Sequence, residues 1–174
     1  MPNPNPQILA AAGKRAFEKG DFAAARQAFS EAAETYLAKG DSLNAAEMKN
    51  NLSVALLKAK RAQEALEAVA GTEDIFAQAG DVRRQALAIG NQAAALEALG
   101  RLDEAIAAYE RCAALLAEVG EGDLQSSVLQ SAAALKLRRG KFTDSAIALL
   151  GSLESVRKPS LLQRLMKFLL RLKP

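Results

Sequence analysis

The stretch GRLDEAIAAY, residues 100–109, decides how this chain folds, because variants of it recur at a constant interval of 40 residues. Each variant starts with Gly or Lys and has an apolar residue two positions on, a small residue five on and a larger apolar residue nine on. A constant interval of this length predicts a repeat architecture, with one supersecondary unit per repeat. The four copies are GDFAAARQAF from Gly20, KRAQEALEAV from Lys60, GRLDEAIAAY from Gly100 and GKFTDSAIAL from Gly140.

A second set of turns halves the interval. Gly40, Gly80 and Gly120 lie midway between the copies, each followed by an acidic residue. Glycine can end one helix in a left-handed conformation and the acid can cap the next, so each repeat predicts two helices. Gly71, with Thr72 as a new cap, is expected to break or kink one of them. We expect helices over residues 6–19, 22–39, 42–59, 62–79, 83–99, 102–119, 123–139, 142–157 and 160–173.

Composition supports an all-α chain. Half of the residues are apolar, and the aromatic residues are six Phe and two Tyr with no Trp. Helical hairpins stack into a solenoid because none can bury its apolar face alone. We therefore predict an α-solenoid of four helix-turn-helix repeats, opened by Asn5 as cap and Pro6 in the first turn. Its parts are a lead over 1–5, repeats near 6–45, 46–85, 86–125 and 126–158, and a C-terminal amphipathic helix over 159–174.

Several functional classes find no support in the sequence. The chain has no His and a single cysteine, Cys112, which occupies a repeat position otherwise filled by small residues and is expected to be packed rather than reactive. Asp103 and Glu104 begin a helix, where its dipole accounts for them. Residues 1–156 carry 17 basic and 20 acidic residues. This part of the chain therefore lacks the excess of positive charge that is typical of nucleic-acid-binding proteins. We expect a non-enzymatic protein without metal or cofactor. A single cysteine allows no intramolecular disulfide, which favours the cytoplasm, and the lack of a signal peptide or membrane span favours a soluble protein.

The repeats resemble the tetratricopeptide repeat (TPR) family, as a variant with a 40-residue period, over residues 6 to about 158. The resemblance rests on the Gly, aromatic and Ala positions of the quoted copies and on a small residue at the eighth position of each repeat. The resemblance implies a scaffold or adaptor whose first helices line a concave groove that binds a peptide or protein segment. The eighth-position residues are Gly13, Ser53, Ala93 and Ala133.

The same resemblance places specific side chains in the groove. Asn51 and Asn91 are equivalent, and a ladder of carboxamides can pair with the backbone of a bound segment. The alternative is that these Asn residues satisfy loose backbone groups or face water. Gly90, in mid-helix, indicates close approach of either a ligand or a neighbouring helix. The basic groove residues favour an acidic segment. The predicted peptide-binding residues are Asn51, Asn91, Asn50, Lys14, Phe17, Val54, Leu57, Lys58, Gln130 and Arg138.

The last residues form a separate basic, apolar segment. Pro159 ends the preceding helix, Ser160 can cap another, and no acidic residue follows Glu154. One interpretation is a helix that caps the open end of the array. The other is a helix that also docks on an anionic membrane surface or a protein, which would make the protein a membrane-peripheral assembly factor. The residues assigned to such contact are Leu161, Leu165, Met166, Phe168, Leu169, Arg164, Lys167 and Arg171.

Overall fold

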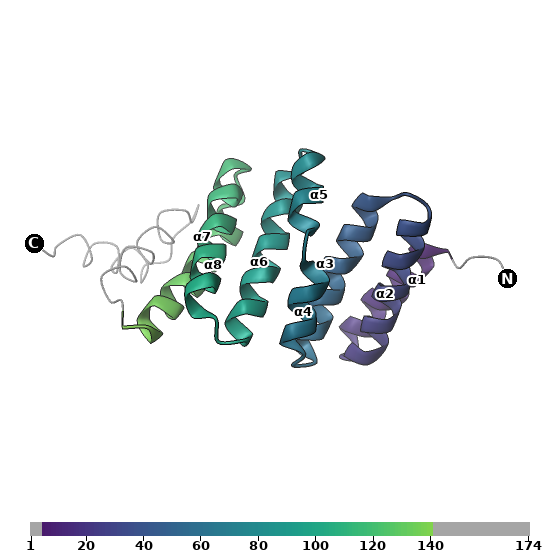
Figure 1. Ribbon diagram of the computed structural model, residues 1–174, viewed down its shortest axis with the longest axis horizontal. Coiled ribbons are helices and arrows are strands. Elements are labelled where there is room, and N and C mark those ends of the chain that lie inside the picture. Colours follow the sequence, from purple (N-terminus) through teal and green to yellow (C-terminus); the bar gives the residue numbers. More distant parts are fainter. Residues whose placement is uncertain (1–4, 141–174) are drawn as a thin grey trace, which may run out of the picture.

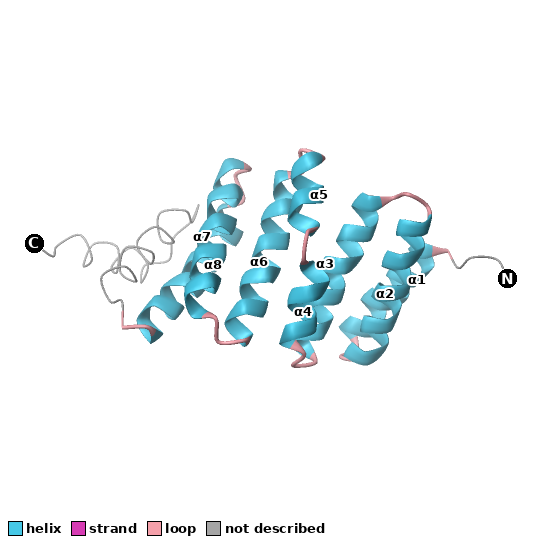
Figure 2. Ribbon diagram, viewed as in Figure 1, coloured by secondary structure: helices cyan, strands magenta, loops and turns pink. Residues whose placement is uncertain are grey.

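The computed structural model describes residues 5–140, and within this range every regular element is an α-helix (Figures 1 and 2). The helices follow one another in a row along the long axis of the molecule (Figure 1). The predicted all-α repeat fold is confirmed, while the helices expected over 142–157 and 160–173 lie outside the described residues. The helices are α1 (Pro6–Glu18), α2 (Phe22–Ala38), α3 (Ser42–Lys58), α4 (Ala62–Val69), α5 (Thr72–Gln78), α6 (Val82–Ala98), α7 (Leu102–Glu118) and α8 (Gly122–Arg138).

The turns recur every 20 residues with a left-handed residue at each. Glycines hold this conformation, with φ between 69° and 77°, at every such turn except one. At the exception Lys60 adopts φ 62°, a conformation that costs a residue with a Cβ about 1 kcal/mol or more. The predicted role of glycine in ending the helices is therefore confirmed. The turn glycines are Gly20, Gly40, Gly80, Gly100, Gly120 and Gly140.

Acidic residues cap two of the helices that follow the midway turns. Asp41 Oδ1 accepts a hydrogen bond from the Asn44 backbone N–H at 3.0 Å, and Asp81 Oδ1 accepts one from Arg84 at 2.9 Å. The Asn44 side chain also donates from Nδ2 to Asp41 Oδ2 at 2.7 Å, and this bond, followed by the backbone bond, lowers the pKa of Asp41. The backbone bond from Arg84, followed by its side chain, lowers the pKa of Asp81. Glu121 does not cap α8, contrary to expectation; its carboxylate instead accepts from Arg83 Nε at 2.6 Å. The longer Glu side chain is a poorer cap than Asp.

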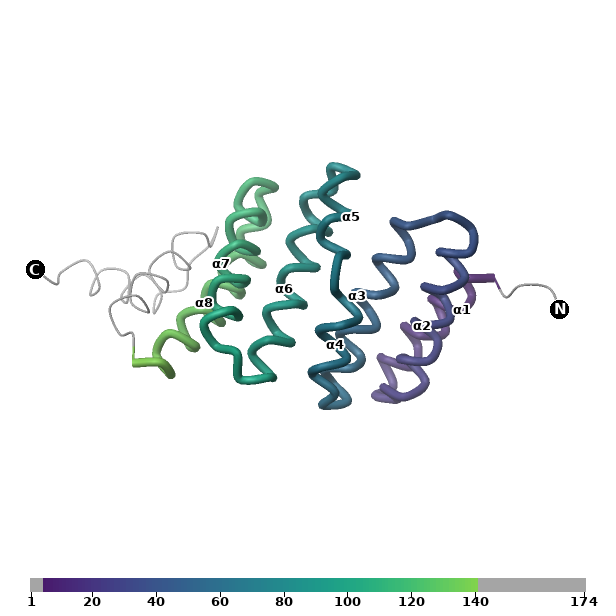
Figure 3. Tube along the Cα trace, in the orientation of Figure 1, coloured from purple at the N-terminus to yellow at the C-terminus, as the bar shows by residue number. Residues whose placement is uncertain are grey.

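The helix expected over 62–79 is two helices. Helix α4 ends at Val69, Ala70 is extended (φ −57°, ψ 131°), and Gly71 has φ 72° (Figure 3). Thr72 is the first residue of α5 rather than its cap, and its hydroxyl donates to the Val69 carbonyl oxygen at 2.7 Å. The break predicted at Gly71 is confirmed, whereas the capping role predicted for Thr72 is wrong.

The helices form two layers. Ion pairs between helices that are not consecutive in the sequence show which helices lie in the same layer. In the first, Arg84 Nη1 of α6 lies 3.4 Å from Glu47 Oε2 of α3. In the second, Arg111 Nη2 of α7 lies 3.2 Å from Glu73 Oε1 of α5. We call the layer of α1, α3, α6 and α8 the groove layer, and the layer of α2, α4, α5 and α7 the outer layer.

The core lies between these layers and repeats with the sequence. In the three copies within residues 5–140, the small residues five positions in are fully buried and the larger residues nine positions in are nearly so. Close packing of this kind transmits any change of side-chain volume to both layers. The buried positions are Ala25, Ala65 and Ala105 for the small residues, and Phe29, Val69 and Tyr109 for the larger ones.

Gly13 marks the closest approach of α1 to α2. A Cβ at this position would lie 2.7 Å from Cδ1 and Cε1 of the buried Phe29 ring. We expect Gly13→Ala to lower the free energy of unfolding by about 1–2 kcal/mol, because the cost of overpacking exceeds the helix propensity that alanine adds. Urea denaturation followed by circular dichroism measures the change. Gly90→Ala is the matched control, since its Cβ would meet only Cys112 Sγ at 3.3 Å. A more stable Gly13→Ala protein would contradict the predicted clash.

Candidate functional site

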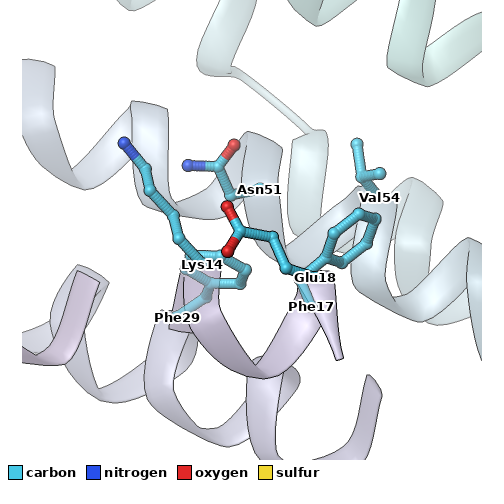
Figure 4. Close-up of a pocket in the computed structure, with 6 residues that line it drawn as sticks. All are labelled: Lys14, Phe17, Glu18, Phe29, Asn51 and Val54. Atoms are coloured by element: carbon cyan, nitrogen blue, oxygen red, sulfur yellow. The ribbon is translucent and has the colours of Figure 1, made fainter. Parts of the chain in front are cut away.

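The groove layer carries a pocket beside α1 and α3 (Figure 4). Its volume is about 160 Å³, close to that of a cavity known to hold a benzene ring. Figure 4 shows Phe17 beside Val54 on one side, with the Lys14 amine and the Asn51 amide on the other. The pocket can therefore hold one apolar side chain with polar groups beside it. Its lining residues are Lys14, Phe17, Glu18, Phe29, Asn51 and Val54.

A second pocket, of about 260 Å³, continues along the same layer toward α6. Asn51 lines both pockets, so the two are neighbours and form one groove. Asn91 joins Asn51 in the second pocket, which brings together the two residues that the 40-residue period makes equivalent. The second pocket is lined by Glu47, Asn50, Asn51, Phe76, Arg83, Arg84, Leu87 and Asn91.

The amides of Asn51 and Asn91 are available to a ligand. Both side chains are partly exposed, and neither makes a hydrogen bond to another residue of the described range 5–140. Each amide offers donors and an acceptor, which is the set of groups needed to pair with a peptide backbone. The groove thus presents unpaired amides beside an apolar pocket.

Asn50 has a structural bond in addition to its place at the second pocket. Its side chain is 8% exposed. Its Oδ1 accepts a hydrogen bond from Thr72 Oγ1 at 3.0 Å, so it ties α3 to the start of α5. The sequence left the role of Asn50 open between ligand contact and internal pairing, and this bond is internal pairing.

The arginines of the second pocket are held by other residues. Arg84 Cζ lies 5.2 Å from the centre of the Phe76 ring, and Arg84 Nε donates to Asp81 Oδ2 at 2.6 Å. By contrast, Lys14 and Lys58 are exposed and form no ion pair with another described residue. These two lysines are therefore free to meet an acidic ligand.

Some predicted groove residues line neither pocket. Leu57 packs against the core cluster of Leu56, Ala65 and Ala95. The Arg138 guanidinium lies 3.9 Å from Glu97 Oε1, and Gln130 Nε2 is 3.4 Å from Ser126 Oγ. Lys58 is exposed, as noted above. Conversely, the sequence prediction missed Phe29, Phe76, Arg83 and Arg84 as pocket residues.

The comparisons with known proteins identify the family. The model of the family described as soluble NSF attachment protein, SNAP, matches residues 10–171. The chain belongs to the SNAP family. Among the solved structures that match this SNAP-family chain is a kinesin light chain from Podosopora anserina, described as having nearly identical TPR-like repeats. The TM-score is 0.76 at 15% identity, over 93% of this chain and 83% of that chain.

These comparisons agree with a TPR-like helical repeat protein. At 15% identity the kinesin light chain supports the fold alone. A search of curated proteins found no match to the SNAP-family chain. Stacked helical repeats of this type present extended surfaces for binding other proteins.

Cys112 and Gly90 of the SNAP-family protein serve packing between α6 and α7. Cys112 is 1% exposed, and a Cβ at Gly90 would lie 3.3 Å from its sulfur, so α6 and α7 pack closely at this point. Burial raises the pKa of the Cys112 thiol to about 11, so the thiol is protonated at neutral pH. The expectation of a packed cysteine is confirmed, and Gly90 contacts a helix rather than the groove.

The remaining predictions for this SNAP-family chain concern membranes, metals and the tail. No helix within residues 5–140 has the length and apolar character needed to span a membrane. In the same range no three His, Cys, Asp or Glu side chains lie together as metal ligands would. The residues predicted for membrane or partner contact lie outside the described part of the chain. They are Leu161, Arg164, Leu165, Met166, Lys167, Phe168, Leu169 and Arg171.

Proposed function

We propose that this protein is a non-catalytic cytoplasmic adaptor that holds a segment of a partner protein in the groove formed by its first helices. The observation that carries the proposal is the pair of partly exposed amides, Asn51 and Asn91, which line one pocket without a partner in the described range. Backbone pairing by amides binds a segment without requiring particular side chains. Membership of a family named for attachment supports the same role.

The pockets suggest what the segment contains. An apolar side chain fits the pocket of Phe17, Phe29 and Val54, where burial of an apolar group supplies most of the affinity. Acidic residues beside this anchor would meet Lys14 and Lys58, which form no ion pair with other described residues. The proposed ligand is an extended segment with one apolar anchor and flanking carboxylates.

Replacing Asn51 and Asn91 together with alanine is expected to weaken capture of such a segment by roughly tenfold, because two backbone hydrogen bonds of about 0.5–1.5 kcal/mol each are lost. Peptides selected from a random display library on the full chain supply the probes, and calorimetric titration measures their affinities. We expect the selected peptides to be rich in Asp, Glu and large apolar residues.

The control for this experiment is Gln92→Ala, which removes a neighbouring, partly exposed amide that lines neither pocket. Its affinity for the selected peptides should equal that of the unaltered protein. Circular dichroism establishes that the helical content of each variant is unchanged. Equal affinity of the Asn51→Ala/Asn91→Ala protein for the selected peptides would refute the groove assignment.

A further inference from the structure

The outer layer has a pocket of its own, which we call the outer seam. Its volume is about 350 Å³, and it lies between α2 and α4 with two leucines of α3 among its lining residues. The groove pockets open between helices of the other layer, so the outer seam is a separate site. It is lined by Arg26, Ser30, Leu52, Leu56, Glu64, Glu67 and Ala68.

The outer seam combines apolar and acidic groups. Leu52, Leu56 and Ala68 supply apolar surface. Glu64 and Glu67 are exposed, and they are held by Arg61 Nε at 2.6 Å and Gln63 Nε2 at 2.9 Å respectively. Arg26 is the cation among the lining residues. Such a surface suits a helix with apolar residues on one side and basic residues on the other.

The two layers differ strongly in charge. Helices α2, α4, α5 and α7 of the outer layer carry ten acidic and two basic residues. Helices α1, α3, α6 and α8 of the groove layer carry eight basic and four acidic residues. A basic ligand is therefore attracted to the outer layer and repelled from the groove layer.

The chain itself contains a segment with the complementary chemistry. Residues 157–173 include six basic residues and no acidic one. Their sequence predicts an amphipathic helix with leucine, methionine and phenylalanine on its apolar side. This basic C-terminal segment thus offers apolar side chains for Leu52 and Leu56 and cations for Glu64 and Glu67.

The position of the seam favours docking between copies. Residue 140 follows α8 at one end of the row, whereas α2 lies toward the other end and α4 near the middle (Figure 1). Helices α5 to α8 separate the two within one copy, while a second copy is free of this restriction. We infer that the basic C-terminal segment of one copy docks in the outer seam of a second copy. Contact between two different surfaces joins copies head to tail and leaves one seam open at the end of each chain of copies.

A charge swap in the full-length protein tests this inference. Glu64→Lys/Glu67→Lys reverses the charge of these two seam positions, and Arg164→Glu/Lys167→Glu reverses the charge of two positions in the basic C-terminal segment. Each double variant alone should self-associate at least roughly tenfold more weakly than the unaltered protein, because like charges then face each other. An equimolar mixture should recover self-association, because the unaltered segment of the seam variant meets the unaltered seam of the segment variant and the two reversed surfaces also carry opposite charges. Sedimentation velocity over a range of concentrations measures all four samples.

Glu104→Lys provides the matched control for the seam variant. Glu104 lies 40 residues after Glu64 and pairs with Arg101 as Glu64 pairs with Arg61, but it is not part of the seam. Its self-association should be unchanged, as should that of Asn51→Ala/Asn91→Ala, which separates this inference from the proposed groove function. Circular dichroism checks that every variant remains helical.

Four outcomes would overturn the inference. The first is an unaltered protein that stays monomeric at every concentration tested. The second is a mixture of the two double variants that forms no dimer. The third is a protein that does not self-associate but binds phosphatidylserine vesicles equally well with and without Glu64→Lys/Glu67→Lys. The basic C-terminal segment would then be a membrane contact instead. A monomer that loses stability on Arg164→Glu/Lys167→Glu would indicate that the segment caps its own array.

Discussion

Replacing Phe76 with alanine is expected to lower the free energy of unfolding by about 3–5 kcal/mol, a large share of the roughly 5–15 kcal/mol that stabilises a domain. The Phe76 side chain is fully buried and packs in one cluster with Ala46, Val69 and Ala88. Its ring also supports the Arg84 guanidinium at the edge of the second groove pocket. Truncation leaves a cavity under the groove and removes this support.

Urea denaturation measures the loss for Phe76→Ala. The control is Phe22→Ala, whose ring is only partly buried and meets Phe17 edge to face at 5.4 Å between centroids. The control should lose less stability because less apolar surface returns to water. Equal losses for the two variants would show that Phe76 is not the central packing residue of this repeat.

Replacing Thr72 with valine is expected to lower the free energy of unfolding by about 1–3 kcal/mol. Valine keeps the shape of threonine but removes the hydroxyl, whose single proton is shared between Asn50 Oδ1 at 3.0 Å and the Val69 carbonyl oxygen at 2.7 Å. The cost arises because a nearly buried amide oxygen is left without its donor. The break between α4 and α5 should become less rigid as a result.

A double-mutant cycle with Asn50→Ala isolates the bond between the two side chains. The loss for the double variant should be smaller than the two single losses taken together, since either change alone already removes the bond. Urea denaturation of the three variants and the unaltered protein supplies the four free energies. Additive losses would mean that Asn50 and Thr72 contribute to stability independently of one another.

The helices of this protein could be predicted from sequence because local signals determine them. A left-handed residue recurs every 20 residues, and Asp41 and Asp81 cap the helices that follow. These signals act within a few residues, so the printed sequence contains all of them. Glu121 departs from the pattern because a contact 38 residues away, with Arg83, engages its carboxylate. A contact of that kind cannot be read from local sequence.

Groove residues could be predicted from the sequence only where the chain follows its 40-residue repeat. The period makes Asn51 and Asn91 equivalent, and both line the second pocket. Phe76 was missed because the break at Gly71 changes the direction of the chain just before it, and Arg84 was missed because it precedes the predicted start of its repeat near residue 86. The bond of Asn50 depends on the same break, since it brings Thr72 to the side chain. Where the chain departs from its own repeat, tertiary contacts decide the site.

The opposite charges of the two layers have a kinetic consequence. Ten acids on one set of helices and an excess of base on the other give residues 5–140 an electric dipole directed across the row. A dipole of this kind turns an approaching charged molecule before any contact forms and raises the rate of productive encounters. Acidic chains would thus reach the groove layer first and basic chains the outer layer. Added salt, which shortens the range of the field, would slow both encounters.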